Sequence, residues 1–90
     1  MNPFEEKVIK TLTEHFKPTM LELEPHDEFR LHVFIASDKF ENQGDLDRQA
    51  QIWKVLRKNL TKAEQKKIVW FSAYTPAEYE AYNEPLSTSA

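Results

Sequence analysis

The chain has 90 residues, a formal net charge of −3 and no cysteine. With 40% hydrophobic and 30% charged residues it has the composition of a soluble globular domain, and its length limits it to one sheet and a few helices. The lack of cysteine excludes disulfides, thiolate metal ligands and thiol nucleophiles. No apolar run approaches the ~18 residues of a membrane span, and the charged start MNPFEEKVIK differs from a signal peptide, so a cytoplasmic protein without a membrane partner is predicted.

The first predicted element is a helix over residues 3–16. Asn2, Pro3 and Glu5 have the pattern of a capped helix start, with a capping side chain, an early proline and a carboxylate that bonds back. Apolar residues then recur at every fourth position: Phe4, Val8, Leu12 and Phe16. This spacing predicts one buried helix face, and Pro18 ends the helix.

Two strands joined by a turn are predicted next, near residues 20–24 and 29–36. The first alternates leucines with glutamates, as expected of a strand half open to water, and Pro25-His26-Asp27 forms the turn. The second strand has two faces, with Leu31, Val33 and Ile35 on one and His32 and Phe34 on the other. The tight turn predicts antiparallel pairing.

A second helix is predicted near residues 46–60, after the loop that holds the only glycine of the chain. Gly44 or Asp45 can cap this helix. Its predicted buried stripe is Leu46, Ala50, Trp53, Leu56 and Leu60.

Two further segments have the spacing of a capping box, in which a threonine precedes a glutamate by three residues. Thr61 with Glu64 predicts one extra helical turn after the second helix. Thr75 with Glu78 opens a short helix near residues 76–82.

The compact apolar segment Ile68–Phe71 predicts a last strand near residues 67–73. Because crossovers between strands of one sheet are right-handed, this strand should lie parallel to the strand at 29–36. The order helix, strand, strand, helix, short helix, strand, helix predicts an α+β domain over residues 1–82, with a small mixed three-stranded sheet and helices packed on one face. The polar tail, residues 83–90, is predicted to be disordered. The predicted core includes Leu12, Phe16, Val33, Ile35, Trp53, Leu56 and Val69.

The charges are distributed unevenly. Residues 21–47 hold eight acidic side chains against two basic ones, and residues 48–67 hold seven basic side chains against one acidic one. A basic block of this kind is either a solvated helix face or a surface that attracts an acidic partner or nucleic acid.

Several motifs together resemble the BolA family. Ser37-Asp38-Lys39-Phe40, followed by Leu46, Arg48 and Ile52, is similar to the family pattern of a strand that ends in Ser-Asp-x-Phe and a helix that begins Leu-x-Arg-His-Arg. The segment from Ala73 to Tyr79 is similar to the closing Thr-Tyr-Thr-Pro-Glu-Glu-Trp of the family. The resemblance covers roughly residues 4–82 and implies a fold similar to one form of the KH domain.

The resemblance implies a small cytoplasmic partner of monothiol glutaredoxins in iron–sulfur or redox regulation, or a transcriptional regulator that binds DNA. Several family positions are altered here. The Arg-His-Arg segment is Arg48-Gln49-Ala50, the family glycine falls at Asn42 with Gly44 displaced, and the family's loop histidine or cysteine falls near residues 28–30. The histidine that ligates the shared cluster falls at Lys67. Because a protonated lysine has no lone pair for iron, the usual cluster site is predicted to be absent and no cofactor is expected.

Of the three histidines, His26 in its acidic turn is the best remaining metal candidate, whereas His15 and His32 are explained by structural positions. The sequence has no Gly-rich phosphate loop, no paired metal-binding histidines and no nucleophile elbow, so no enzyme is predicted.

Two functions therefore remain open. The first is a BolA-like, non-enzymatic protein-interaction module with impaired cluster ligation, and the alternative is a nucleic-acid-binding transcriptional regulator that uses the basic second helix. The candidate residues for binding a partner or nucleic acid are Lys39, Asn42, Gly44, Arg48, Gln49, Lys54, Arg57, Lys58 and Lys67.

Overall fold

The computed structural model describes residues 2–82. In chain order the elements are α1 (Pro3–Phe16), β1 (Met20–Pro25), β2 (Leu31–Ala36), the 3-10 turn η1 (Asp38–Phe40), α2 (Asp45–Asn59), α3 (Lys62–Gln65), β3 (Ile68–Tyr74) and α4 (Pro76–Tyr82). The predicted elements are confirmed, and their predicted ends lie within two residues of the observed ones. The predicted disordered tail, residues 83–90, lies outside the described residues.

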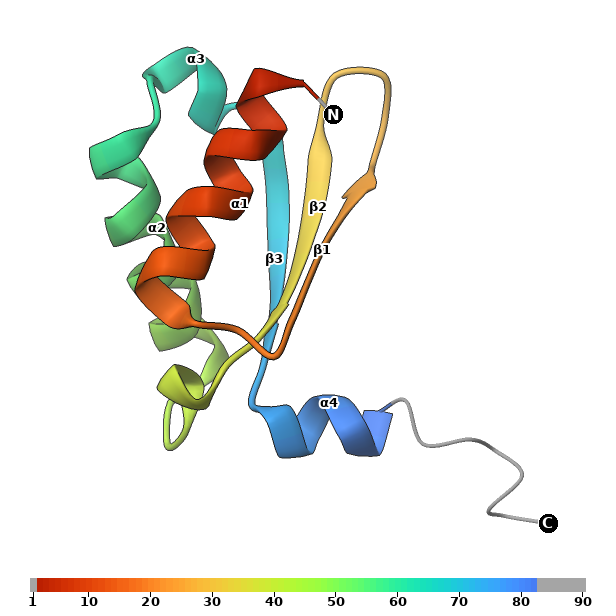
Figure 1. Cartoon of the computed structure of the whole chain (residues 1–90), viewed down its shortest axis with the longest axis vertical. Helices are drawn as coiled ribbons and strands as arrows, with labels where there is room; N and C mark the ends of the chain where they lie inside the picture. Colours follow the sequence, from red (N-terminus) through yellow and green to blue (C-terminus); the bar gives the residue numbers. More distant parts are fainter. Residues whose placement is uncertain (1, 83–90) are drawn as a thin grey trace, which may run out of the picture.

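The three strands form one mixed sheet in the order β1-β2-β3. β1 pairs antiparallel with β2, and β2 pairs parallel with β3, as the short turn and the helical crossover predict. α1 and α2 lie side by side on one face of the sheet, and α4 lies beyond the end of β3 (Figure 1). The predicted α+β fold class is confirmed. None of the helices within residues 2–82 is long and apolar enough to cross a membrane.

The core fills the space between the sheet and the two long helices. Its buried side chains include Val8, Leu12 and Phe16 of α1, Val33 and Ile35 of β2, Ile52 and Leu56 of α2, and Phe71 of β3. The predicted core residues of α1, β2 and Leu56 are thus confirmed, whereas Trp53 is half-buried at the edge of the core.

The capping boxes are also confirmed. The Asn2 side chain accepts a hydrogen bond from the Glu5 amide at 2.8 Å, and Thr61 accepts from the Glu64 amide at 3.1 Å. At the start of α4 the Glu78 amide donates to Thr75 at 3.1 Å. Each box satisfies backbone donors that a helix start otherwise leaves without partners.

The predicted buried stripe of α2 is confirmed at Leu56 and Leu60 and wrong at Leu46 and Ala50, which are exposed. The buried residues of the helix are Arg48, Gln49, Ile52 and Leu56. Two polar side chains point inward because β3 offers them backbone carbonyl oxygens: Gln49 donates to the Phe71 oxygen at 2.6 Å and Arg48 to the Ala73 oxygen at 3.0 Å. A hydropathy pattern cannot assign polar residues to a buried face.

The prediction of Val69 as a core residue is also wrong, because Val69 is half-buried. Leu31 pairs with Ile68 but His32 pairs with Trp70, so Val69 is the extra residue of an irregularity in β3. The extra residue shifts the alternation of side chains, and Phe71 occupies the core instead.

The loop between β2 and α2 is a structural element. Ser37 is fully buried, its hydroxyl donates to the Phe16 carbonyl at 2.6 Å, and it accepts a hydrogen bond from the Lys39 amide at 3.1 Å. Phe40 is fully buried and its ring centre lies 5.2 Å from that of Phe16. The Ser-Asp-x-Phe motif therefore attaches the loop to the end of α1.

Asn42 has a φ of 63°, in the left-handed region, and it occupies the position where the resemblance places a glycine. Asn is one of the few residues besides Gly that adopts this conformation readily. Gly44 has an ordinary φ of −76° and is the N-cap of α2. The left-handed backbone conformation that favours glycine is therefore at Asn42, and Gly44 does not need it.

Candidate functional site

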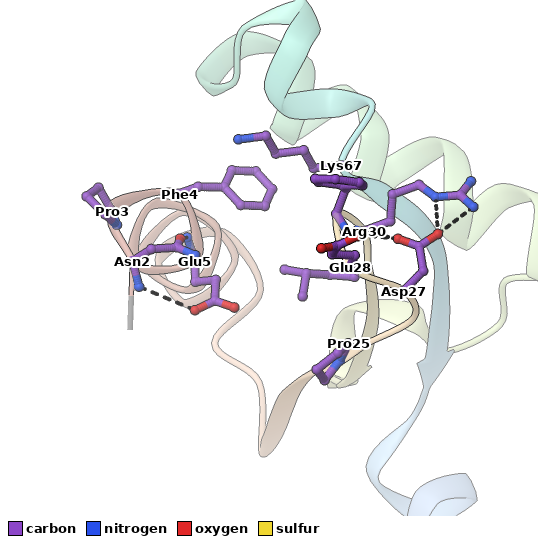
Figure 2. A pocket seen from close by; sticks show the side chains of 11 residues that line it. Asn2, Pro3, Phe4, Glu5, Pro25, Asp27, Glu28, Arg30 and Lys67 are labelled. Carbon is purple, nitrogen blue, oxygen red and sulfur yellow. Dashed lines mark hydrogen bonds and ion pairs between the residues drawn. The ribbon is translucent and has the colours of Figure 1, made fainter.

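A pocket of about 600 Å³ opens at one end of the sheet, between the start of α1, the turn that joins β1 to β2, and the residue before β3. Figure 2 shows these three segments facing one another. The lining residues are Asn2, Pro3, Phe4, Glu5, Pro25, Asp27, Glu28, Phe29, Arg30, Leu31 and Lys67.

The turn on one side of the pocket is ordered by Asp27. Its carboxylate accepts hydrogen bonds from the amides of Phe29 at 2.9 Å and Arg30 at 2.8 Å, and the Arg30 guanidinium donates to the second oxygen at 2.8 Å. The hydrogen bond from Arg30, with those from the two amides, lowers the pKa of Asp27 to about 2. Because the turn bonds within itself, it holds Phe29 in place with 76% of its surface exposed.

Lys67 forms another wall of the pocket. Its carbonyl oxygen accepts a hydrogen bond from the Leu31 amide at 2.7 Å, which fixes its backbone to the first residue of β2. Its ammonium lies 5.2 Å from the centre of the Phe4 ring, an arrangement in which the ring attracts the cation (Figure 2). Lys67 belongs to none of the ion pairs among residues 2–82, so its charge is available to an external acceptor.

Two of the predicted binding residues are engaged inside the fold. Arg48 forms an ion pair with Glu78 and also donates to the Gln43 carbonyl at 2.9 Å. Gln49 is buried against the Phe71 carbonyl. The prediction that these two residues bind a partner is therefore corrected. Their role is structural, because their polar groups join α2 to β3 and α4.

The other predicted residues do not form one site. Lys67 lies where β2 and β3 begin, whereas Lys39, Asn42 and Gly44 lie in the loop after β2 has ended, at the opposite end of the sheet. The remaining cations, Lys54, Arg57 and Lys58, are exposed on α2.

One of these cations lines a second, smaller hollow. Arg57, Lys62 and Lys66 surround it together with Trp53 and Gln65, and its volume is about 330 Å³. The Arg57 guanidinium lies 5.8 Å from the centre of the Trp53 ring. This hollow combines three cations with an aromatic surface and contains no acidic side chain.

Phe29 was not among the predicted site residues, because its apolar side chain was assigned to the strand predicted at 29–36. The available signal was its neighbourhood: Phe29 is the one apolar residue in the segment from His26 to Arg30. Phe4 was predicted only as part of the buried face of the first helix, and the structure places it half-buried beside Lys67.

No family model and no curated protein matches the sequence. Solved structures do match. The crystal structure of a Bol-like protein from Babesia bovis has 27% identity and a TM-score of 0.66, and the match covers 88% of this chain and 92% of that one. The BolA domain of SufE1 from Arabidopsis thaliana has 23% identity and a TM-score of 0.70, covering 87% and 98%. The solution structure of BolA1 from Mus musculus has 21% identity and a TM-score of 0.67, covering 94% and 75%.

The element order, the mixed sheet and the helices packed on one face define a small α+β domain. Within that class the fold is that of BolA-like proteins, as the four matching structures show, and the motifs around Ser37 and Thr75 are similar to those of the family.

The donor set of the pocket does not fit the cluster that the resemblance implies. The lining residues include no histidine, the chain has no cysteine, and the ammonium of Lys67 has no lone pair to donate to a metal. Within residues 2–82 no three histidine, aspartate or glutamate side chains are grouped to hold a metal ion. His26 is exposed in the turn and does not line the pocket.

Proposed function

We propose that this protein is a non-enzymatic BolA-like interaction module in the cytoplasm, which docks a protein of the monothiol-glutaredoxin type at the pocket between Phe4, Phe29 and Lys67. The observation that carries the proposal is the geometry of Lys67, whose cation lies over Phe4 at the wall of an open pocket. The sequence resemblance aligns Lys67 with the family's cluster-ligating histidine, which supports the proposal.

The chemistry of the pocket suits a protein surface. Phe29 offers an exposed aromatic ring on an ordered turn, and such rings are frequent anchors of protein interfaces. Beside it, the free charge of Lys67 can donate to a carboxylate or a carbonyl oxygen of the partner. The turn needs no reordering on binding because Asp27 and Arg30 already hold it, so the loss of conformational entropy is small.

We further propose that docking proceeds without a shared iron–sulfur cluster. A cluster shared between two proteins needs a histidine or thiolate from each, and this pocket supplies a protonated amine instead. The protein would then compete with cluster-ligating relatives for the same partner, which is a regulatory role.

The docking proposal is tested by titrating a monothiol glutaredoxin into the protein in a calorimeter. Phe29→Ser and Lys67→Ala should each weaken binding by about tenfold, as expected for interface residues of intermediate importance. Leu46→Ser is the matched control, because Leu46 is an equally exposed apolar residue on α2, at 81% exposure. Equal weakening by Leu46→Ser, or no effect of Phe29→Ser, contradicts the proposed site.

The second experiment is anaerobic cluster reconstitution of the two proteins together. The wild type should give no new histidine-ligated spectrum, and Lys67→His should move the spectrum toward that of a histidine-ligated cluster. A wild-type cluster that disappears in His26→Ala would overturn the proposal and assign metal binding to the acidic turn.

A second candidate function is supported by the hollow at Trp53. Arg57, Lys62 and Lys66 can neutralise phosphates there, and the Trp53 ring can stack on a base, as in proteins that bind single strands. If the chain is a nucleic-acid-binding regulator, it should retard DNA at ~50 mM salt, with binding that weakens steeply as salt rises. Absence of retardation at low salt, or retardation unchanged in an Arg57/Lys62/Lys66 triple alanine variant, contradicts this candidate.

A further inference from the structure

The face of the sheet opposite α1 and α2 carries acidic and aromatic side chains in rows, and neither proposed function uses them. Cross-strand partners place Glu24, His32 and Trp70 in one row, and Glu22, Phe34 and Ser72 in the next. Side chains of paired residues point to the same side of a sheet, so these six residues share one surface, which we call the open face. α1 and α2 both lie on the other side of the strands (Figure 1).

The centre of the open face is aromatic and fixed. The rings of His32 and Phe34 are stacked, with centres 4.2 Å apart and planes 14° apart. His32 Nε2 lies 2.8 Å from the Ser72 hydroxyl oxygen, a hydrogen bond that orients the imidazole. Trp70 is 49% exposed beside them. The face therefore presents a preordered aromatic surface to solvent.

α4 closes the surface at one end. Tyr74, two residues after Ser72 on the same side of β3, packs against Tyr79 and Tyr82, with ring centres 5.6 and 5.7 Å away. Among residues 2–82, no helix covers the other end or the β1 side (Figure 1).

The β1 side of the open face is acidic. Glu22 and Glu24 are both exposed, and the ion pairs among residues 2–82 are formed by other side chains. Two unpaired carboxylates beside aromatic rings attract a cation that can also stack, and they repel a phosphate backbone. They also oppose a second copy of this chain on the same face, because the copy would bring two further carboxylates. Charge complementarity thus selects a basic peptide segment.

We propose that the open face binds an extended, arginine-containing segment of a partner protein. Glu22 and Glu24 are two residues apart on one strand, about 6.8 Å, which is also the spacing of alternate residues in an extended peptide. Arginines at alternate positions of the segment therefore reach both carboxylates. Their planar guanidinium groups can form hydrogen bonds to the carboxylates through their edges and stack on His32, Phe34 and Trp70 through their faces. A lysine ammonium can pair with a carboxylate but has no planar face to stack.

The test uses a short synthetic peptide with arginine at two alternate positions, added to the full chain at low salt. Binding is followed by amide chemical shifts and by the fluorescence of Trp70, in a Trp53→Phe background so that one indole remains. We expect shifts confined to β1, β2 and β3, and an affinity at least about fivefold higher than that of the same peptide with lysines.

The decisive variant is Glu22→Gln/Glu24→Gln, which keeps the side-chain shapes at exposed positions. It should lower the affinity about tenfold, since two ion pairs are removed. Glu6→Gln/Glu14→Gln is the matched control: it removes the same charge from exposed positions on α1, at the other side of the sheet, and should change the affinity less than about twofold.

Three outcomes overturn the proposal: equal weakening by both double variants, chemical shift changes that map to the pocket at Lys67, and equal binding of an acidic peptide. So does a dimer of the free protein that Trp70→Thr abolishes, because a second copy would then occupy the open face. Failure of the glutaredoxin titration leaves this test unaffected, since Phe29 and Lys67 lie outside the open face.

Discussion

The guanidinium of Arg48 donates to both carboxylate oxygens of Glu78, at 2.6 and 3.1 Å, and so joins α2 to α4. α4 has no buried residue of its own, and the same guanidinium also reaches the carbonyls of Gln43 and Ala73. One side chain on the second helix thus connects the loop before it, the end of β3 and the last helix.

Arg48→Ala should lower the free energy of unfolding by about 2–3 kcal/mol, because two carbonyl oxygens and a carboxylate lose a charged donor of which only 11% is exposed. Arg48→Lys should recover little of the loss, since an ammonium cannot form the fork. Urea denaturation measures both, and Arg57→Ala, which changes an exposed arginine on the same helix, is the control. A loss below that of Arg57→Ala contradicts the structural role of Arg48.

Glu78 should make the stability dependent on pH in the acid range. The hydrogen bond from Arg48, with that from the Thr75 amide, lowers the pKa of Glu78 from 4.5 to about 2 in the folded protein. The unfolded chain therefore takes up this proton first as the pH falls, so the contribution of Glu78 is fully present above about pH 5 and is lost between about pH 5 and pH 2. Unfolding free energies measured across this range should have a smaller slope in Glu78→Gln. Glu80→Gln, on the exposed side of α4, should keep the wild-type slope.

Asn42 should be replaceable by glycine but not by alanine. Its φ of 63° is costly for a residue with an ordinary Cβ, so Asn42→Ala should destabilise the protein by about 1 kcal/mol, whereas Asn42→Gly should be neutral or slightly stabilising. Thermal denaturation of the two variants gives the comparison. Equal melting temperatures for both variants would show that the loop relaxes around position 42.

Gly44 should accept a side chain. It is the N-cap of α2 without a side-chain hydrogen bond, its φ is −76°, and no heavy atom beyond Gly44 and its two chain neighbours lies within 4 Å of the position that a Cβ would take. Gly44→Ser should therefore stabilise the protein by a few tenths of a kcal/mol, because serine can accept from an amide of the first turn. Gly44→Val, with no acceptor, should not stabilise it. Urea denaturation resolves the difference, and a gain with valine would argue against capping as the cause.

Some features of this protein depend on residues close together in sequence, and the sequence alone determined them. The capping boxes at Asn2, Thr61 and Thr75 connect residues three apart, and the apolar spacing of α1 repeats within one helix, so both could be predicted from local pattern. The strand pairing followed from one tight turn and one crossover. The position of Lys67 next to the start of the last strand could also be predicted from sequence.

Other features depend on contacts between distant residues, and only the tertiary structure decided them. Arg48 and Gln49 face inward because β3 supplies carbonyl oxygens there, which no hydropathy pattern contains. Val69 leaves the core because β3 pairs irregularly with β2. The pocket needs Phe4, the turn at Phe29 and Lys67 to meet, and the open face needs one residue from each of three strands in a row. Local pattern sets which face of an element is apolar; packing against distant elements sets which polar groups find partners inside and which are left to bind something else.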